Sequence, residues 1–258
     1  MTENVPTALL MLTAGPPASR PRLEGAGRDA DGPIENSLLA ALPRKEQRRL
    51  LAALEPVTLG FGKVLYEPGD TISHVYFPGA SLVSLLTLAD GHLALEVGLI
   101  GREGMVGLPL VLGHVLSPVR ALVQGAGTAL RMTAARFLKE FRLSLPLQRE
   151  LYRYTYALMA QISQTAACNR FHVVERRLAR WLLMTHDRVK SDRFHMTHEF
   201  LGHMLGVRRV GVTKAAQALQ QRKLIRYSRG DITVLDRGGL EAASCRCYEV
   251  VKDMHDGA

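Results

Sequence analysis

The spacing of hydrophobic residues predicts a β-sheet region followed by helices. Residues 57–132 consist of short apolar runs separated by turn residues, among them Glu67-Pro68-Gly69-Asp70. Strands that recur every 8–12 residues or so, each followed by a turn, are typical of an antiparallel barrel or roll. Two short amphipathic helices are expected before it, at 37–42 and 46–54, whereas the Pro- and Gly-rich residues 1–36 predict a disordered arm.

After Pro146 the apolar period becomes helical. Five residues at successive spacings of four, three, four and four form a narrow apolar stripe: Leu147, Leu151, Tyr154, Leu158 and Ile162. The helix is expected to reach about Asn169, which exceeds the average globular helix of ~11–12 residues. Such a helix packs across its own domain or pairs with a second copy as a short coiled coil, and the stripe alone leaves both readings open. A second helix is predicted from Val173 to about His186.

A helix-turn-helix pattern follows in the last third of the chain. Thr197 can cap a short helix that breaks at Gly206, where a glycine tolerates the positive φ of a tight turn. A second helix begins near Arg208, and its apolar face consists of Val212, Ala215, Ala216 and Leu219. Two short helices joined in this way form the supersecondary unit that places its second helix in the DNA major groove.

A predicted β-hairpin after these helices turns the pattern into a winged helix. Residues 224–227 and 232–235 read as strands, and the tip between them contains Arg229. We expect Arg209 to make a bidentate contact with guanine, and Arg208, Lys214 and Arg229 to contact phosphates. The full set of candidate DNA-contacting residues is Thr197, Arg208, Arg209, Val210, Thr213, Lys214, Gln217 and Arg229.

The distribution of charge agrees with a polyanionic partner. The 258 residues carry a formal charge of +9, but residues 1–169 have a net charge of +2 and residues 170–258 a net charge of +7. Between Phe200 and Gly230 there is no Asp or Glu and there are seven Lys or Arg. A surface normally mixes both signs, so such a stretch indicates nucleic acid first and a membrane surface second, although a solvated basic face without function would look the same.

Composition excludes other classes. Apolar residues make up 47% of the chain, enough for a core, yet no apolar run is long enough to span a membrane. The three cysteines, Cys168, Cys245 and Cys247, are too few for a disulfide framework and fit a reducing compartment, so we expect a cytoplasmic protein. The Cys-x-Cys pair lacks the C-x₂-C partners of a zinc ribbon, and we interpret all three as unremarkable thiols. His186, His195, His198 and His203 lack i, i+4 ligand spacing, so no metal site is expected.

The chain resembles the Crp/Fnr family of bacterial transcription regulators. The features that carry the resemblance are the roll glycines in Glu67-Pro68-Gly69-Asp70, Ala89-Asp90-Gly91 and Gly101-Arg102-Glu103-Gly104, the long helix, and the segment from Thr197 to Arg209. The resemblance implies an α+β fold: a jelly-roll-like double-stranded β-roll of cyclic-nucleotide-binding type, a long dimerisation helix and a C-terminal winged helix-turn-helix. It also favours a dimer interface for the stripe of Leu147, Leu151, Tyr154, Leu158 and Ile162.

Departures from the family pattern limit the expected ligands. Family sensors of cyclic nucleotides place a Gly-Glu pair about ten residues before an Arg that a small hydroxylated residue follows. Here Glu103 and Arg120 are the candidate ligand-binding residues, but seventeen positions separate them and Ala121 follows Arg120. We therefore expect no cyclic nucleotide binding of the usual kind. No iron–sulfur cluster is expected either, because the family's cluster uses N-terminal cysteines and this chain has none before Cys168.

The expected function is that of a homodimeric, sequence-specific regulator of transcription that binds a near-palindromic site in double-stranded DNA. Val210 stands where the family often has Glu, so the DNA sequence read is expected to be non-standard. RNA polymerase is a further candidate partner.

No catalytic motif is present, so we expect no enzyme. The alternative is a ligand-gated regulatory subunit that acts through protein contacts. The predicted domains are 1–36 (arm), 37–145 (β-roll), 146–170 (dimerisation helix), 171–240 (winged helix) and 241–258 (tail).

Overall fold

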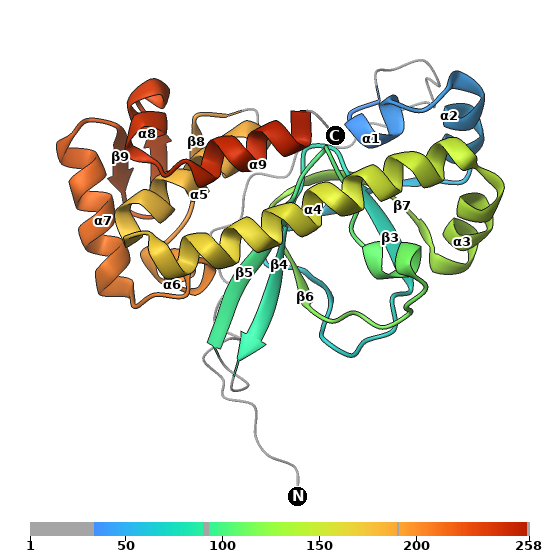
Figure 1. Ribbon diagram of the computed structural model, residues 1–258, viewed down its shortest axis with the longest axis horizontal. Coiled ribbons are helices and arrows are strands. Elements are labelled where there is room, and N and C mark those ends of the chain that lie inside the picture. The colour runs from blue at the N-terminus through green and yellow to red at the C-terminus, as the bar shows by residue number, and fades with distance from the viewer. Residues whose placement is uncertain (1–33, 90–92, 190, 257–258) are drawn as a thin grey trace, which may run out of the picture.

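The computed structural model describes residues 34–89, 93–189 and 191–256, and these form a β-roll and a helical unit joined by one long helix (Figure 1). The predicted arm at 1–36 lies almost wholly outside the described residues, as does most of the turn at Ala89-Asp90-Gly91. The α+β fold class is confirmed. No helix among the described residues combines the length and apolarity needed to cross a membrane.

The roll consists of two antiparallel sheets. One has the strand order β1-β7-β3 and the other β2-β6-β4-β5. The strands are β1 (Glu55–Leu59), β2 (Val64–Tyr66), β3 (His74–Pro78), β4 (Leu82–Ala89), β5 (Leu93–Ile100), β6 (Arg120–Gly125) and β7 (Gly127–Thr133). Apolar side chains from both sheets meet in one core that includes Val75, Val83, Val123 and Met132. The predicted roll is therefore present.

Short helices close the roll. These are α1 (Ser37–Ala40), α2 (Arg44–Leu51), the 3₁₀ helix η2 (Leu108–Leu112) and α3 (Ala134–Leu143), of which η2 and α3 were not predicted. Asn36 caps α1 by accepting from the Leu39 amide, and its Nδ2 donates to the carbonyls of Pro78 and Gly104 at 2.9 Å. One buried side chain thus fixes the start of α1 to the roll.

The long helix α4 (Leu145–Phe171) begins at Ser144, whose hydroxyl accepts from the Leu147 amide, with Pro146 in its first turn. Its apolar stripe faces the roll: Leu147, Leu151, Tyr154 and Leu158 are at most 5% exposed and belong to the roll core, and Ile162 packs against that core. For Leu147, Leu151, Tyr154 and Leu158 the interpretation as a dimer interface is therefore wrong, because the chain's own sheets cover these side chains. Ile162 is half-buried, and its place in an interface stays a prediction.

The helical unit after α4 contains a small three-stranded sheet. Its helices are α5 (Val174–Arg188), α6 (His198–Leu205), α7 (Arg209–Gln221), α8 (Arg237–Ala243) and α9 (Cys247–Asp256). Its strands, β8 (Arg193–His195), β9 (Ile225–Ser228) and β10 (Asp231–Val234), pair in the order β8-β10-β9. Strand β8 was not predicted. Most of the predicted tail at 241–258 is the helix α9, which lies back along α4 (Figure 1).

The roll and the helical unit share a core. Leu82, Leu86 and Leu99 of the roll belong to the same buried cluster as Leu178 and Leu182 of α5. Two polar contacts cross the same boundary: Trp181 Nε1 donates to Glu96 at 2.8 Å, and Arg188 Nε pairs with Glu103 at 2.7 Å. The helical unit is therefore seated on the roll by both packing and hydrogen bonds.

Candidate functional site

The helix-turn-helix forms because glycines permit a close crossing of α6 and α7. Gly206 ends α6 in the left-handed region with φ of 59°, and a Cβ there would lie 2.8 Å from Leu95 Cδ1 of β5. A Cβ on Gly202 would lie 2.9 Å from the Val207 carbonyl oxygen. Thr197 caps α6 by accepting from the Phe200 amide at 3.1 Å. The predicted cap and turn are both confirmed.

Helix α7 presents a polar face next to its buried one. Its buried side chains are the four predicted from the sequence: Val212, Ala215, Ala216 and Leu219. Of the candidate contact residues on this helix and at its start, Thr213 is half-buried and the others are exposed: Arg208, Arg209, Val210, Lys214 and Gln217. Five of the six candidate residues on α7 and at its start are therefore accessible to a partner.

The N-terminus of α7 bears positively charged side chains, which are unfavourable there when no anion is bound. Arg208 is its N-cap residue without a side-chain capping bond, Arg209 is its first residue, and its first turn has no acidic side chain. A helix N-terminus carries a partial positive charge, so two arginines there repel it. The same arrangement is favourable when an anion such as a phosphate binds at this end.

His198 joins α6, α7 and the hairpin. Its ring stacks on that of Tyr227 in β9 with centroids 4.0 Å apart, and its Nδ1 lies 3.0 Å from Thr213 Oγ1 in α7. Burial, with a smaller contribution from the charge of Arg209, lowers the pKa of His198, which keeps the ring neutral at neutral pH. Thr213 also donates to the Arg209 carbonyl, so its hydroxyl is held inside the unit.

The tip of the β9–β10 hairpin is a two-residue turn of Arg229 and Gly230. Both residues have positive φ, 52° and 89°, as a type I′ turn requires, although Asn or Asp is the usual residue where Arg229 stands. Lys223, just after α7, also has a positive φ of 60° in a place where Gly is common. Two basic residues therefore occupy backbone conformations that L side chains rarely adopt, and strain of this kind gathers at functional sites.

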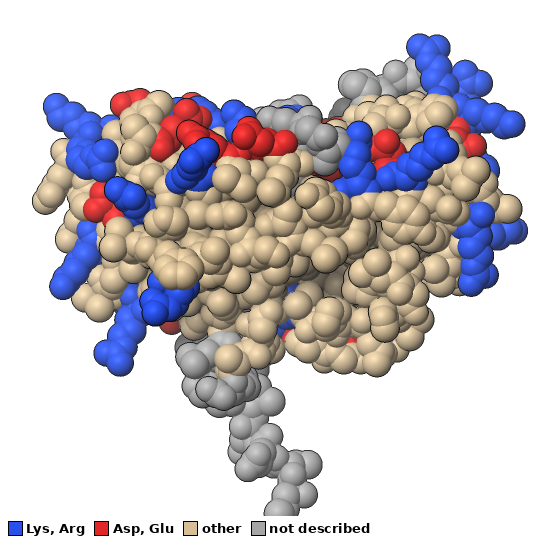
Figure 2. All heavy atoms as spheres, viewed as in Figure 1, with Lys and Arg blue, Asp and Glu red and all other residues tan. Residues whose placement is uncertain are grey.

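The acidic side chain next to the hairpin tip, Asp231, is paired with basic ones. Asp231 at the base of the hairpin tip pairs with Arg193 at 2.8 Å and with His195 at 3.1 Å. The hydrogen bond from Arg193, followed by that from His195, lowers the pKa of Asp231. Lys and Arg side chains project around the end of the molecule that carries α7, at the left of Figure 2. The described surface from residue 200 to residue 230 is accordingly basic.

The candidate ligand residues of the roll do not converge. Arg120 Nε pairs with Glu67 at 2.7 Å, whereas Glu103 pairs with Arg188 of α5 and accepts from the Gly101 amide at 3.1 Å. A cavity of about 110 Å³ beside Glu103 is lined by Tyr154 and residues of α1 and α4, and Arg120 does not line it. Each of the two side chains is thus engaged with a separate partner.

Sequence reasoning missed one group of residues. The sequence interpretation treats the cysteines as unremarkable thiols, but in the structure Cys168, Cys245 and Cys247 gather with His172 at the junction of α4 and α9. The histidines that sequence reasoning weighed as ligands have other partners: His186 contacts Asp192, and His195 contacts Asp231. The i, i+4 spacing of Cys168 and His172 was the available signal, but the other two ligands lie more than seventy residues away.

Comparison with protein families identifies the helical unit. Residues 176–243, from α5 to α8, match the sequence model of the Crp-like helix-turn-helix domain. Comparison with curated protein sequences finds no match. The matched range includes every candidate DNA-contacting residue.

Solved structures share the fold over most of the chain. FixK2 from Bradyrhizobium japonicum aligns with a TM-score of 0.64 at 14% identity, covering 74% of this chain and 98% of that chain. The c-di-GMP responsive global regulator CLP from Xanthomonas campestris aligns with a TM-score of 0.62 at 16% identity, covering 74% and 99%. A transcriptional regulator of the CRP/FNR family from Thermus thermophilus aligns with a TM-score of 0.60 at 20% identity, covering 74% and 98%. At 14–20% identity these similarities show a shared fold.

Proposed function

Because residues 176–243 are a Crp-like helix-turn-helix domain in a chain with the fold of Crp/Fnr regulators, we propose that the protein regulates transcription by binding double-stranded DNA as a homodimer. The observation that carries the proposal is the exposed face of α7 and the hairpin tip, which is basic and free of Asp and Glu throughout residues 200–230. An anion at the N-terminus of α7 relieves the repulsion between that helix end and its two arginines.

Helix α7 enters the major groove with its N-terminal residues against the base edges. Arg209 contacts a guanine, and the exposed Val210 offers an apolar surface to a neighbouring base such as thymine. Arg208, Lys214 and Arg229 bind phosphates, with Gln217 and Thr197 at the margins of the contact. Thr213 acts indirectly, because its hydroxyl already bonds to His198 and to the Arg209 carbonyl and so fixes the start of α7.

The homodimer forms through the outer face of α4. Tyr152, Tyr156 and Met159 on this face are 52%, 67% and 61% exposed and follow spacings of four and three, as a coiled-coil seam does. In Figure 2 a broad band without charged side chains crosses the face of the molecule on which α4 lies, and charged side chains stand at its margins. Pairing there presents two α7 helices to half-sites about 34–36 Å apart on a near-palindromic operator.

The roll acts as the sensor, and its contacts with the helical unit transmit the signal. Leu95 of β5 packs at the Gly206 turn, and Glu96 bonds to Trp181 of α5, so a shift of β5 moves the helix-turn-helix. The partners of Glu103 and Arg120 give no support to cyclic nucleotide binding of the usual kind. RNA polymerase is the partner through which a DNA-bound dimer would act on transcription.

The test is selection of DNA fragments by the full chain, followed by fluorescence anisotropy over a range of salt concentrations. A specific site should emerge whose affinity falls steeply with salt, because phosphate contacts release counterions. Arg209→Ala should lose about 5- to 100-fold in affinity and relax specificity at one position of each half-site. Lys214→Ala should weaken all sequences alike and reduce the salt slope by about 1.

Arg142→Ala is the matched control, since this exposed arginine lies on α3 at the opposite end of the molecule. It should leave affinity and salt slope unchanged. Absence of binding to every fragment, or binding that salt does not affect, would overturn the proposal and favour a regulatory subunit that acts through protein contacts.

A further inference from the structure

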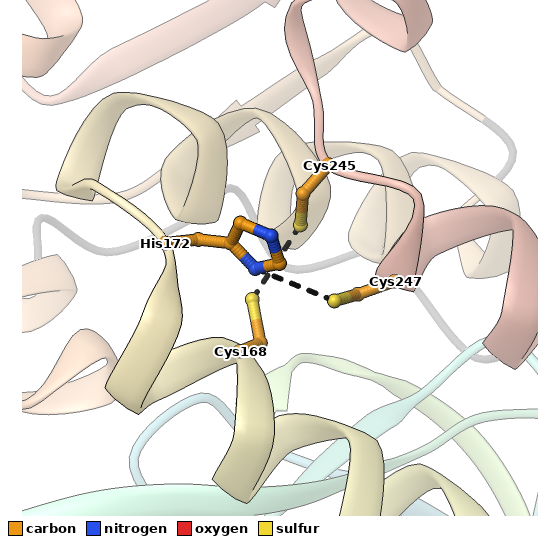
Figure 3. A group of neighbouring side chains, drawn as sticks. All are labelled: Cys168, His172, Cys245 and Cys247. Atoms are coloured by element: carbon orange, nitrogen blue, oxygen red, sulfur yellow. Dashed lines mark hydrogen bonds between the residues drawn. The ribbon is translucent and has the colours of Figure 1, made fainter.

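Three thiols and one imidazole meet at a single point (Figure 3). One potential ligand atom from each of Cys168, His172, Cys245 and Cys247 lies within 4.8 Å of all the others. Cys168 Sγ is 3.5 Å from Cys245 Sγ, and Cys247 Sγ is 3.5 Å from His172 Nδ1. The cysteines are 0%, 3% and 3% exposed, and they include every cysteine in the sequence.

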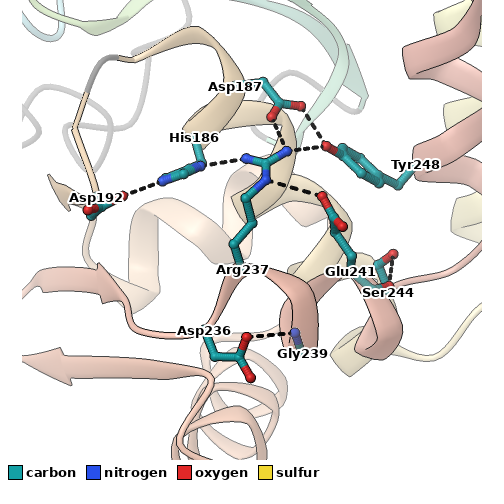
Figure 4. Close-up of polar contacts among 9 residues, drawn as sticks. All are labelled: His186, Asp187, Asp192, Asp236, Arg237, Gly239, Glu241, Ser244 and Tyr248. Atoms are coloured by element: carbon teal, nitrogen blue, oxygen red, sulfur yellow. Dashed lines mark hydrogen bonds and ion pairs between the residues drawn. The ribbon is translucent and has the colours of Figure 1, made fainter.

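Rigid elements hold the four side chains in this arrangement. Cys168 and His172 are one turn apart at the C-terminal end of α4, and Cys245 and Cys247 lie at the junction of α8 and α9. Arg237 of α8 fixes that junction to α5 (Figure 4): its guanidinium donates to Asp187 at 2.6 Å, to Tyr248 Oη at 2.7 Å and to His186 Nδ1 at 2.7 Å. The two halves of the cluster are thus brought together by contacts independent of the thiols.

The spacing of the four atoms fits a single tetrahedral ion. With metal–sulfur bonds of about 2.3 Å and metal–nitrogen bonds of about 2.0–2.1 Å, ligand atoms of a tetrahedron lie roughly 3.5–3.8 Å apart. The two contacts of 3.5 Å within the cluster, and the 4.8 Å that no pair of ligand atoms exceeds, match this size. An iron–sulfur cluster places several irons between its ligands and needs a wider set. Three sulfurs and one imidazole nitrogen form a common structural zinc set.

Buried positive charge surrounds the cluster. Arg177 and Arg180 of α5 are 7% and 4% exposed, and both interact electrostatically with Cys168. Among the described residues neither forms an ion pair, and the Nε atom of each is buried without a hydrogen-bond partner. Buried guanidinium groups require compensation by negative charge. Three thiolates around a divalent cation have a net charge of −1 and supply it.

We propose that Cys168, His172, Cys245 and Cys247 form a structural site for one Zn²⁺ ion, which joins the end of α4 to the start of α9. Binding displaces the three thiol protons to solvent, and the imidazole coordinates in its neutral form through Nδ1. Gln164 supports the site, since its Nε2 donates to Cys247 Sγ at 3.0 Å. The bond that forms is between metal and sulfur, so no oxidant is needed.

The test measures metal in the full chain, purified without a histidine tag under reducing conditions. Elemental analysis should find one Zn²⁺ per chain. After removal of the metal with a chelator, titration with Co²⁺ should give the visible absorption of a tetrahedral site and a sulfur-to-cobalt charge-transfer band, both saturating at one equivalent. Added Zn²⁺ should then abolish these bands, because a tetrahedral thiolate site prefers zinc.

Variants locate the site. Cys247→Ser should weaken Co²⁺ binding at least tenfold and reduce the charge-transfer band, and His172→Ala should shift the ligand-field bands while leaving the charge-transfer band. His114→Ala is the matched control, because this exposed histidine lies far from the cluster in the roll. Circular dichroism checks that each variant is folded.

Three results would overturn the proposal: wild-type protein that neither contains Zn²⁺ nor gives stoichiometric cobalt bands, a Cys168–Cys245 disulfide in protein kept reduced, or bands that Cys247→Ser leaves unchanged. The wild-type titration decides the matter even if a variant fails to fold. It is also independent of DNA binding, which the fragment selection above tests separately.

Discussion

Glu96 is a buried acid at the boundary between the roll and the helical unit. Burial raises its pKa to about 7, although hydrogen bonds from Ser84 and Trp181 and the charges of Arg180 and Arg188 act in the opposite direction. Ser84 Oγ contacts both Glu96 and the amide oxygen of Gln124, and its one proton can serve only one of them. A protonated Glu96 resolves this, since it donates to Ser84, which then donates to Gln124.

The raised pKa predicts that stability falls as the pH rises. In the unfolded chain Glu96 loses its proton near pH 4.5, whereas the folded protein keeps it until about pH 7. Unfolding between these values releases a proton, so the free energy of unfolding should decrease by about 3 kcal/mol from pH 4.5 to pH 7.

Glu96→Gln should lack this decrease, because its amide can donate to Ser84 and accept from Trp181 at every pH. Urea unfolding at a series of pH values measures the difference between the two proteins. Parallel pH profiles for wild type and variant would show that the carboxyl group is already ionised in the folded protein.

Arg229 places a cation at the hairpin tip in a strained backbone conformation. Its φ of 52° belongs to a region that Asn adopts more easily than Arg. Arg229→Asn should therefore raise the free energy of unfolding by about 0.5–1 kcal/mol. The same variant should weaken DNA binding and lower the salt slope by about 1. Thermal unfolding and anisotropy on the selected site measure the two effects, and a loss of both stability and affinity would contradict the role given to this residue.

At the scale of elements, α4 has two apolar faces, one buried and one exposed. The inner face is in the roll core, and the outer face bears Tyr152, Tyr156 and Met159. Tyr156→Glu with Met159→Glu should convert the dimer to a folded monomer, because the added charges lie only on the outer face. Sedimentation or light scattering gives the mass. An unchanged mass would place the interface elsewhere.

The matched control is Leu151→Glu with Leu158→Glu on the inner face. These side chains are 0% and 4% exposed, so the introduced charges should unfold the roll instead of only separating the copies. Circular dichroism distinguishes this outcome from dissociation.

The α4 helix also shows why sequence patterns predict a secondary-structure element better than they predict which part of the protein packs against it. The 4-3-4 spacing of Leu147, Leu151, Tyr154 and Leu158 correctly predicted a helix with a buried stripe, because the period depends only on local geometry. Which surface covers the stripe depends on contacts distant in the chain, and the dimer interpretation came from the resemblance. Short elements such as β8, with three residues, have too few positions to show a period.

The helix-turn-helix could be predicted nearly in full because the signals that define it are close together in the sequence. Its cap at Thr197, its turn at Gly206 and the buried face of α7 are all local signals within 25 residues. The thiol cluster could not, since Cys168 and Cys245 are far apart in sequence and meet only through the packing of α9 on α4. Local sequence signals therefore predict the helix-turn-helix but not the thiol cluster.

At the scale of the whole molecule, the shared core predicts one cooperative unfolding transition. Leu82, Leu86 and Leu99 of the roll and the single tryptophan, Trp181, lie in the same cluster. Fluorescence of Trp181 and far-ultraviolet circular dichroism should therefore give the same urea midpoint at a given protein concentration. Leu99→Ala should lower the free energy of unfolding by about 2–5 kcal/mol. Both urea midpoints should therefore decrease together. Midpoints that differ in the wild type would mean that the roll and the helical unit unfold independently.

The position of the thiol cluster along the chain has a mechanical consequence. Cys168 and His172 immediately precede the helical unit, and Cys245 and Cys247 immediately follow its matched domain at 176–243. With the proposed Zn²⁺ bound, both ends of that unit are joined at one point, and the chain between them forms a closed loop. A unit closed in this way can rotate about the metal site but cannot move away from α4. Under the proposed function, a signal from the roll would then reach the DNA as a change of angle.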